Sequence, residues 1–329
     1  MSQTVNGRRQ LLAMAVAAPL LLIVIAVVLR FAVFPADAGT SAREPLPREV
    51  TSQEKSVLRT AKQYLLRDCM RRHGFVYRPA TGSIPAKPDF LYVIDDVAWA
   101  QAHGYGTDID RAIARLKEED PNQRYFQSLP EERRREALAA ANGSRMDLTV
   151  TTPDGARLSR SREGCQAESE RTLYGDLDTW FRARSSMDAL PMMASQHVLN
   201  DARFTAKVRA WAVCMRAAGH PYASPSDLRK HTAAQKPALS AAQERTLAVA
   251  EARCAGTSGL ARTADALDEK YMGQLRRSHW TLAVAERRLR LAALPRARAI
   301  LAANPTTGPT ALPSATASGL SASSSSGTP

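Results

Sequence analysis

Apolar residues recur at helical spacing along most of the chain. The clearest example begins at Thr51-Ser52-Gln53-Glu54, a capping-box sequence in which a hydroxyl and a carboxylate can bond the free N–H groups at a helix start. Apolar positions then follow three or four residues apart, at Leu58, Ala61, Leu65 and Cys69. Gly74 can end this helix because glycine accepts a left-handed backbone. The pattern predicts a helix over 51–74.

The same criteria predict further helices along the chain. Start signals of Ser, Asp or Pro and stop signals of Gly or Pro delimit them. The predicted helices are 128–143, 200–219, 240–254 and a long one from about 263, which Pro295 should kink or end. Residues 148–161, with Pro153-Asp154-Gly155 at their centre, predict the one β-hairpin.

An apolar run near the N-terminus predicts a membrane segment. Leu11 to Leu29 contains only apolar residues and Pro19, and as a helix it would span roughly 28 Å, close to the hydrocarbon core of a bilayer. Arginines lie on both sides of the run, so they do not decide its orientation. The run is longer than a cleaved signal needs, so we expect an uncleaved anchor; cleavage near Ala38, which would give a secreted protein, is the alternative.

The expected fold class is therefore mainly α: a helical bundle with one small β-hairpin, preceded by a single N-terminal transmembrane helix. The last 26 residues carry no charge and too few large apolar groups to form a core, so we expect them to be disordered. The expected organisation is 1–10, cytoplasmic N-terminus; 11–34, transmembrane anchor or signal segment; 35–50, linker; 51–303, extracytoplasmic helical domain with two cysteine modules (about 51–175 and 200–260); and 304–329, disordered tail rich in Ser, Thr, Ala and Pro.

The four cysteines belong to a repeated pattern. Residues 69–77 and 214–222 both have the form Cys-Met-Arg-x-x-Gly-x-x-Tyr, and each passage ends a predicted helix. One further cysteine follows each passage, Cys165 after the first and Cys254 after the second. Matching modules would be closed by Cys69–Cys165 and Cys214–Cys254 bridges, which is one of three possible connectivities. Such bridges would indicate an oxidising compartment.

Several passages resemble a known group of proteins. They are the Cys-Met-x-x-x-Gly pattern, Tyr-Phe-Gln-Ser-Leu-Pro at 125–130, Gly-Cys-Gln-Ala-Glu at 164–168 and Leu-Ala-Val-Ala-Glu-Ala-Arg-Cys at 247–254. Over roughly residues 50–300 the chain is similar to uncharacterised exported or membrane-anchored helical proteins of high-GC actinomycetes. The resemblance implies export and a location in a bacterial envelope, and it implies no activity. Many such proteins carry a lipidation cysteine, whereas here no cysteine precedes Cys69.

No motif identifies a catalytic residue. Ser52-x-x-Lys55 has the form used by penicillin-recognising enzymes, but no Lys-Thr-Gly accompanies it, and Ser52 lies where a helix cap is expected. Asp95-Asp96 fits a helix N-terminus better than a pair of catalytic carboxylates. Cys69 and His73 are the one pair that suggests a metal, without the clustered ligands of a zinc site. We expect no metal and no cofactor; whether the protein is an enzyme stays open.

Charge is the one global feature that suggests a partner. The chain has 45 Lys and Arg against 32 Asp and Glu, a net charge of +13. The first 30 residues hold three of these cations and no acid, so the remainder carries +10. Arginine clusters at 133–135, 276–277 and 287–290 are the expected basic surface. A solvated helical face is the simplest explanation, and attraction to anionic lipid or wall polymer is the functional one.

These observations predict a non-enzymatic, membrane-anchored cell-envelope protein, with the bulk of the chain outside the cytoplasm and bound to anionic envelope components. One alternative is an exported enzyme with an unrecognised active site. Another is a basic nucleic-acid-binding domain if the chain faces inward; no nucleic-acid motif supports it, and we expect no nucleic-acid partner. A polar cavity that gathers titratable residues would favour the enzyme.

Overall fold

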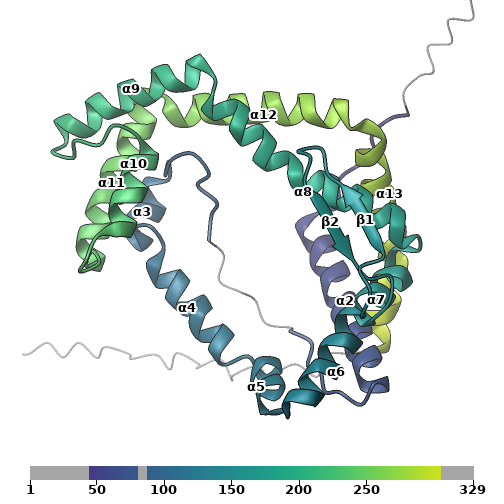
Figure 1. Ribbon diagram of the computed structural model, residues 1–329. Coiled ribbons are helices and arrows are strands. Elements are labelled where there is room, and N and C mark those ends of the chain that lie inside the picture. The colour runs from purple at the N-terminus through teal and green to yellow at the C-terminus, as the bar shows by residue number, and fades with distance from the viewer. Residues whose placement is uncertain (1–43, 81–86, 305–329) are drawn as a thin grey trace, which may run out of the picture. The chain divides into compact units, whose positions relative to one another are not determined.

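The computed structural model describes residues 44–80 and 87–304, which are mainly helical (Figure 1). Twelve helices and one two-stranded sheet make up this part of the chain. The helices are α2 (Ser52–Arg72), α3 (Val97–His103), α4 (Thr107–Glu118), α5 (Pro121–Ser128), α6 (Glu131–Asn142), α7 (Cys165–Tyr174), α8 (Leu177–Leu199), α9 (Ala202–Ala217), α10 (Pro225–Ala234), α11 (Ala241–Ser258), α12 (Leu260–Ser278) and α13 (Trp280–Ala303). Strands β1 (Leu148–Thr151) and β2 (Arg157–Arg160) pair antiparallel.

The fold class expected from the sequence is wrong, because it includes a membrane-spanning helix. Across residues 44–80 and 87–304, no helix combines the length and the apolar character needed to cross a membrane. The run 11–34, on which that expectation was based, lies outside the described residues, as do segment 1–10, most of the 35–50 linker and residues 305–329. The helical character of the described part and its single hairpin agree with the sequence pattern.

Helix ends follow the capping signals in the sequence. Thr51 Oγ1 accepts the Glu54 N–H at 3.1 Å, and the Glu54 carboxylate accepts the Thr51 N–H at 2.9 Å, which completes a capping box. Ser52 is therefore the first helical residue and not the cap. Asp201 caps α9 by accepting the Arg203 N–H, without the reciprocal bond of a capping box.

The long helix expected from residue 263 is two helices. α12 and α13 meet at His279, and Pro295 lies inside α13 instead of ending it. Proline removes one backbone hydrogen bond from a helix. Burial of Ala293, Leu294 and Ala297, which belong to the apolar cluster shared with α2 and the start of α8, offsets that loss.

The helices pack in several separate apolar clusters and not as a bundle around one core. One cluster joins α2, α13 and the region of Leu173 and Trp180, and another joins α9, α11 and α12 around Trp211. Trp180 and Trp211 are fully enclosed, whereas Trp99 and Trp280 are half-buried. Figure 1 shows α2, α7 and α13 close together, and these helices are in contact.

A buried carboxylate connects four elements. Glu170 of α7 is 3% exposed and accepts a hydrogen bond from Lys62 Nζ of α2 at 2.5 Å. It also accepts one from Arg160 of β2, and Arg184 of α8 lies 3.6 Å away. Burial alone would raise the pKa of Glu170, but Lys62 and Arg160 outweigh burial and lower it. The ionised carboxylate therefore holds α2, β2 and α8 around α7.

Replacing this carboxylate should destabilise the fold. We expect Glu170→Gln to reduce the free energy of unfolding by about 2–3 kcal/mol, because cations gathered at a buried site lose their counter-charge. Glu163→Gln is the matched control: it removes an exposed ion pair with Arg145 and should cost less than about 1 kcal/mol. Urea unfolding of both variants measures the difference, and equal losses would show that Glu170 has no special role.

Candidate functional site

Two disulfides join helices that are distant in sequence. Cys69 of α2 is bonded to Cys165, the first residue of α7, and Cys214 of α9 is bonded to Cys254 of α11. The Cα–Cα distances are 5.5 and 5.6 Å, within the usual range for a disulfide. This is the pairing that the two repeated modules predict.

The repeated Cys-Met-Arg-x-x-Gly-x-x-Tyr pattern forms the same helix end twice. Gly74 and Gly219 have φ values of +77° and +84°, which a residue with a side chain rarely adopts. In the first copy the Phe75 N–H donates to the Met70 carbonyl at 2.9 Å, and in the second copy residues 220 and 215 make the equivalent bond at 2.8 Å. Both methionines are buried. The pattern therefore specifies how a helix stops beside its disulfide.

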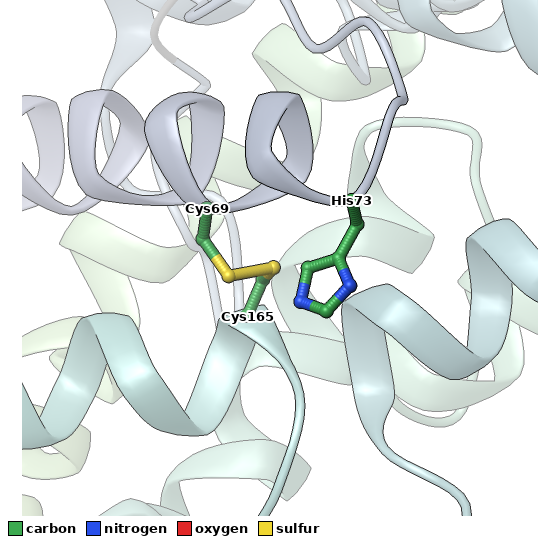
Figure 2. Close-up of side chains that lie close together, drawn as sticks. All are labelled: Cys69, His73 and Cys165. Carbon is green, nitrogen blue, oxygen red and sulfur yellow. A yellow bond between two sulfur atoms is a disulfide. The ribbon is translucent and has the colours of Figure 1, made fainter.

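The first disulfide lies beside a histidine (Figure 2). One atom each of Cys69, His73 and Cys165 lies within 4.8 Å of the others, the only grouping of possible metal ligands in the described ranges. The two sulfur atoms are bonded to each other, so neither is a thiolate, which is the form of cysteine that binds metals. His73 is exposed and Cys165 is fully buried. In its oxidised form this cluster is a structural bridge.

An acidic cavity of about 540 Å³ lies between residues 89–95 and α12. Its lining includes one cation, Arg276, and five carboxyl groups, those of Asp89, Asp95, Asp265, Asp268 and Glu269. Tyr92 donates a hydrogen bond to Asp268 at 2.5 Å. Burial raises the pKa of Asp265, and the neighbouring Asp95 and Asp268 raise it further. A carboxyl whose pKa is raised in a cavity beside other carboxyl groups is a candidate for proton transfer to a ligand.

Three of the acidic residues of this cavity form a pattern that is visible in the sequence. Asp265, Asp268 and Glu269 are three and four residues apart, so a helix places them on one face. Asp95 joins them only through the fold. Its neighbour Asp96 caps α3 by accepting the Trp99 N–H, which confirms a helix N-terminus at this dipeptide. Asp96 is therefore a helix cap and Asp95 a cavity residue, and the two do not act as a pair.

Two buried glutamates of α11 hold residues 94–107. Glu251 is fully buried and accepts hydrogen bonds from the Ile94 N–H at 3.3 Å and the Tyr105 hydroxyl at 2.9 Å. Glu244 accepts the Tyr105 N–H at 2.7 Å and the Thr107 hydroxyl at 2.5 Å. Burial raises the pKa of Glu251 to about 7, and its hydrogen bonds offset only part of that effect. Both glutamates have a structural role, which the sequence did not reveal.

Several guanidinium groups of the expected basic surface are bonded to nearby carboxylates or backbone carbonyls. Arg133 is hydrogen-bonded to Glu136 and lies over the Phe75 ring, and Arg290 is paired with Glu286. Arg287 donates to the Pro47 carbonyl at 2.9 Å and lies 3.7 Å from Glu49. These three members of the arginine clusters seen in the sequence are therefore engaged within the fold.

A smaller cavity, of about 310 Å³, has the opposite charge. Arg203 and Lys207 of α9, Gly259 at the start of α12, and Arg262 and Thr263 in the first turn of α12 line it, with two apolar residues of α12. Its lining holds three cations and no acid. Sequence reasoning missed this site because its cations are isolated along the chain and meet only where α9 packs on α12.

No family model, curated protein or solved structure matches the chain.

The raised pKa of Glu251 predicts a pH-dependent stability. The ordinary pKa of glutamate is 4.5, so between about 4.5 and about 7 the folded state binds more protons than the unfolded state. Wild-type stability should therefore fall as the pH rises through this window, by up to about 3 kcal/mol. Glu251→Gln, which cannot ionise, should not show this fall and should gain stability relative to wild type between pH 5 and pH 8.

Urea unfolding at several pH values measures the effect. Glu118→Gln, an exposed substitution on α4, is the control and should follow the wild-type pH profile. A constant difference between Glu251→Gln and wild type across pH 5–8 would contradict the assigned pKa.

Proposed function

We propose that this chain is a non-enzymatic protein of the cell envelope that works outside the cytoplasm and binds anionic envelope material. The observation that carries the location is the pair of disulfides, because such bonds persist in oxidising compartments and are rare in the cytosol. All four cysteines are paired. Reduction would remove two cross-links, one between α2 and α7 and one between α9 and α11.

Charge supports the anionic partner. An excess of +10 after residue 30 creates a field that attracts polyanions, and the basic cavity concentrates three cations at one place. Wall polymers and anionic lipids are the polyanions of an envelope. Exposed charges act mainly through salt-sensitive attraction, so the binding should weaken as salt increases.

The residues that suggested acyl-transfer chemistry are occupied by other contacts. Ser52 lies in the first turn of α2, and Lys55 Nζ is paired with Glu49 at 2.9 Å. A lysine that activates a serine has to contact the serine hydroxyl, whereas the Lys55 ammonium is bonded to Glu49. This arrangement favours a binding protein over a serine enzyme.

The acidic cavity supports a second candidate, the exported enzyme. It gathers titratable groups in a concave site, and the raised pKa of Asp265 beside Asp95 is an arrangement used for proton transfer. If this candidate is correct, the chain releases soluble fragments from an envelope polymer, and Asp95→Asn or Asp265→Asn abolishes the release.

Reporter fusions test the location. We expect a reporter that folds only in an oxidising compartment to be active when fused to the last residue, and a reporter that works only in the cytoplasm to be inactive. The exported chain should also resist thiol alkylation until a dithiol reductant is added, because its cysteines are bonded. Activity of the cytoplasmic reporter alone, with free thiols, would favour the nucleic-acid-binding alternative.

Co-sedimentation tests the partner. The chain should sediment with anionic wall polymer at low salt and be released at about 1 M salt, where the screening length is about 3 Å. Neutral phosphatidylcholine vesicles serve as the control and should retain little protein at either salt concentration. Equal retention at both salt concentrations would remove the electrostatic explanation, and release of soluble fragments would favour the enzyme.

A further inference from the structure

The basic cavity gathers three cations from two helices in one concave space that no acid lines. Within the part of the chain that the structure describes, neither Lys207 nor Arg262 makes an ion pair, and no acid lines the cavity. Arg203 is held in place by Asp201, through Nε–Oδ1 and Nη2–Oδ2 bonds of 3.0 and 2.8 Å. One oriented guanidinium and two unpaired cations thus face the same space.

The two unpaired cations lie close together. Lys207 Nζ is 3.5 Å and Arg262 Nη2 is 3.9 Å from the point that a Cβ atom at Gly259 would occupy. Like charges held this close repel one another, and an anion between them would remove the repulsion. Glycine at position 259 leaves that space open, and its φ of +73° fits glycine.

The ligand chemistry follows from the donors and the volume. Arg and Lys donors with no acceptor suit an oxyanion, and guanidinium groups match the oxygens of a phosphate. A cavity of about 310 Å³ can hold a phosphate group with part of its hydration, since one water takes about 30 Å³ of liquid volume.

We propose that Arg203, Lys207 and Arg262 bind a phosphodiester group of an anionic envelope polymer. The site rests on the proposed function and gives it a specific location and a ligand chemistry. Charge elsewhere on the chain steers the polymer, and this cavity recognises its phosphate.

The experiment compares two variants with the same change in net charge. Lys207→Gln/Arg262→Gln removes the unpaired cations of the cavity, and Lys230→Gln/Arg253→Gln removes an exposed lysine and an exposed arginine that lie outside its lining. The intact chain with its disulfides is titrated with soluble poly(glycerol phosphate), and thermal unfolding checks that each variant folds. The cavity variant should lose at least about tenfold in affinity, and the control less than about twofold.

Further arms identify the source of the phosphate. Inorganic phosphate should displace the polymer from wild type and should have no effect on the residual binding of the cavity variant. Equal losses in both variants would overturn the site and leave diffuse electrostatic binding, and so would binding to phosphatidylglycerol vesicles without binding to the polymer. Absence of wild-type binding to every anionic probe would instead overturn the proposed function itself.

Discussion

The two disulfides are the constraint on which the rest of the structure depends, because the helices do not share one core. The buried apolar residues form separate clusters, and each bridge lies beside one of them: Cys69 and Cys165 in the cluster of α2, α6 and α7, and Cys254 in that of α9, α11 and α12. The bridges close loops with sequence separations of 96 and 40 residues, which in the chain-entropy model stabilise the fold by about 4–5 and about 4 kcal/mol. The disulfides thus add stability that a single large apolar core would otherwise provide.

Each module also contains a buried glutamate, and the two are stabilised differently. Glu170 is surrounded by Lys62, Arg160 and Arg184, so it stays ionised in the protein interior. Glu251 is held by the Tyr105 hydroxyl and a backbone N–H, and its pKa of about 7 lies far above the ordinary value. Neutral hydrogen bonds compensate a buried charge less completely than cations do. The module with Glu251 therefore loses stability as the pH rises towards 7, whereas the contribution of Glu170 is lost only as the pH falls.

Local signals predicted local structure well and spatial arrangement poorly. The Thr51–Glu54 capping box and the glycines at 74 and 219 fixed helix ends because their effect acts within one turn. The disulfide pairing was predictable because each copy of the repeated pattern is followed by one further cysteine. α8, which contains Pro191, and the break at His279 escaped prediction because packing overrides local propensity there. Both charged cavities form where segments distant in sequence meet. The sequence therefore shows the residues that each segment contributes but not that they line one cavity.

α12 carries opposite charges on two faces. Asp265 and Asp268 face the acidic cavity, while Arg262 and Thr263 face the basic one, and the helix keeps these side chains a fixed angle apart. An anionic layer attracts one face and repels the other, so it exerts a torque on the molecule as well as a pull. Asp268 lies about 120° around the helix from Arg262, so a chain bound through Arg262 holds the acidic cavity at an angle to the layer, open to the solution and to the cations that gather above a polyanion.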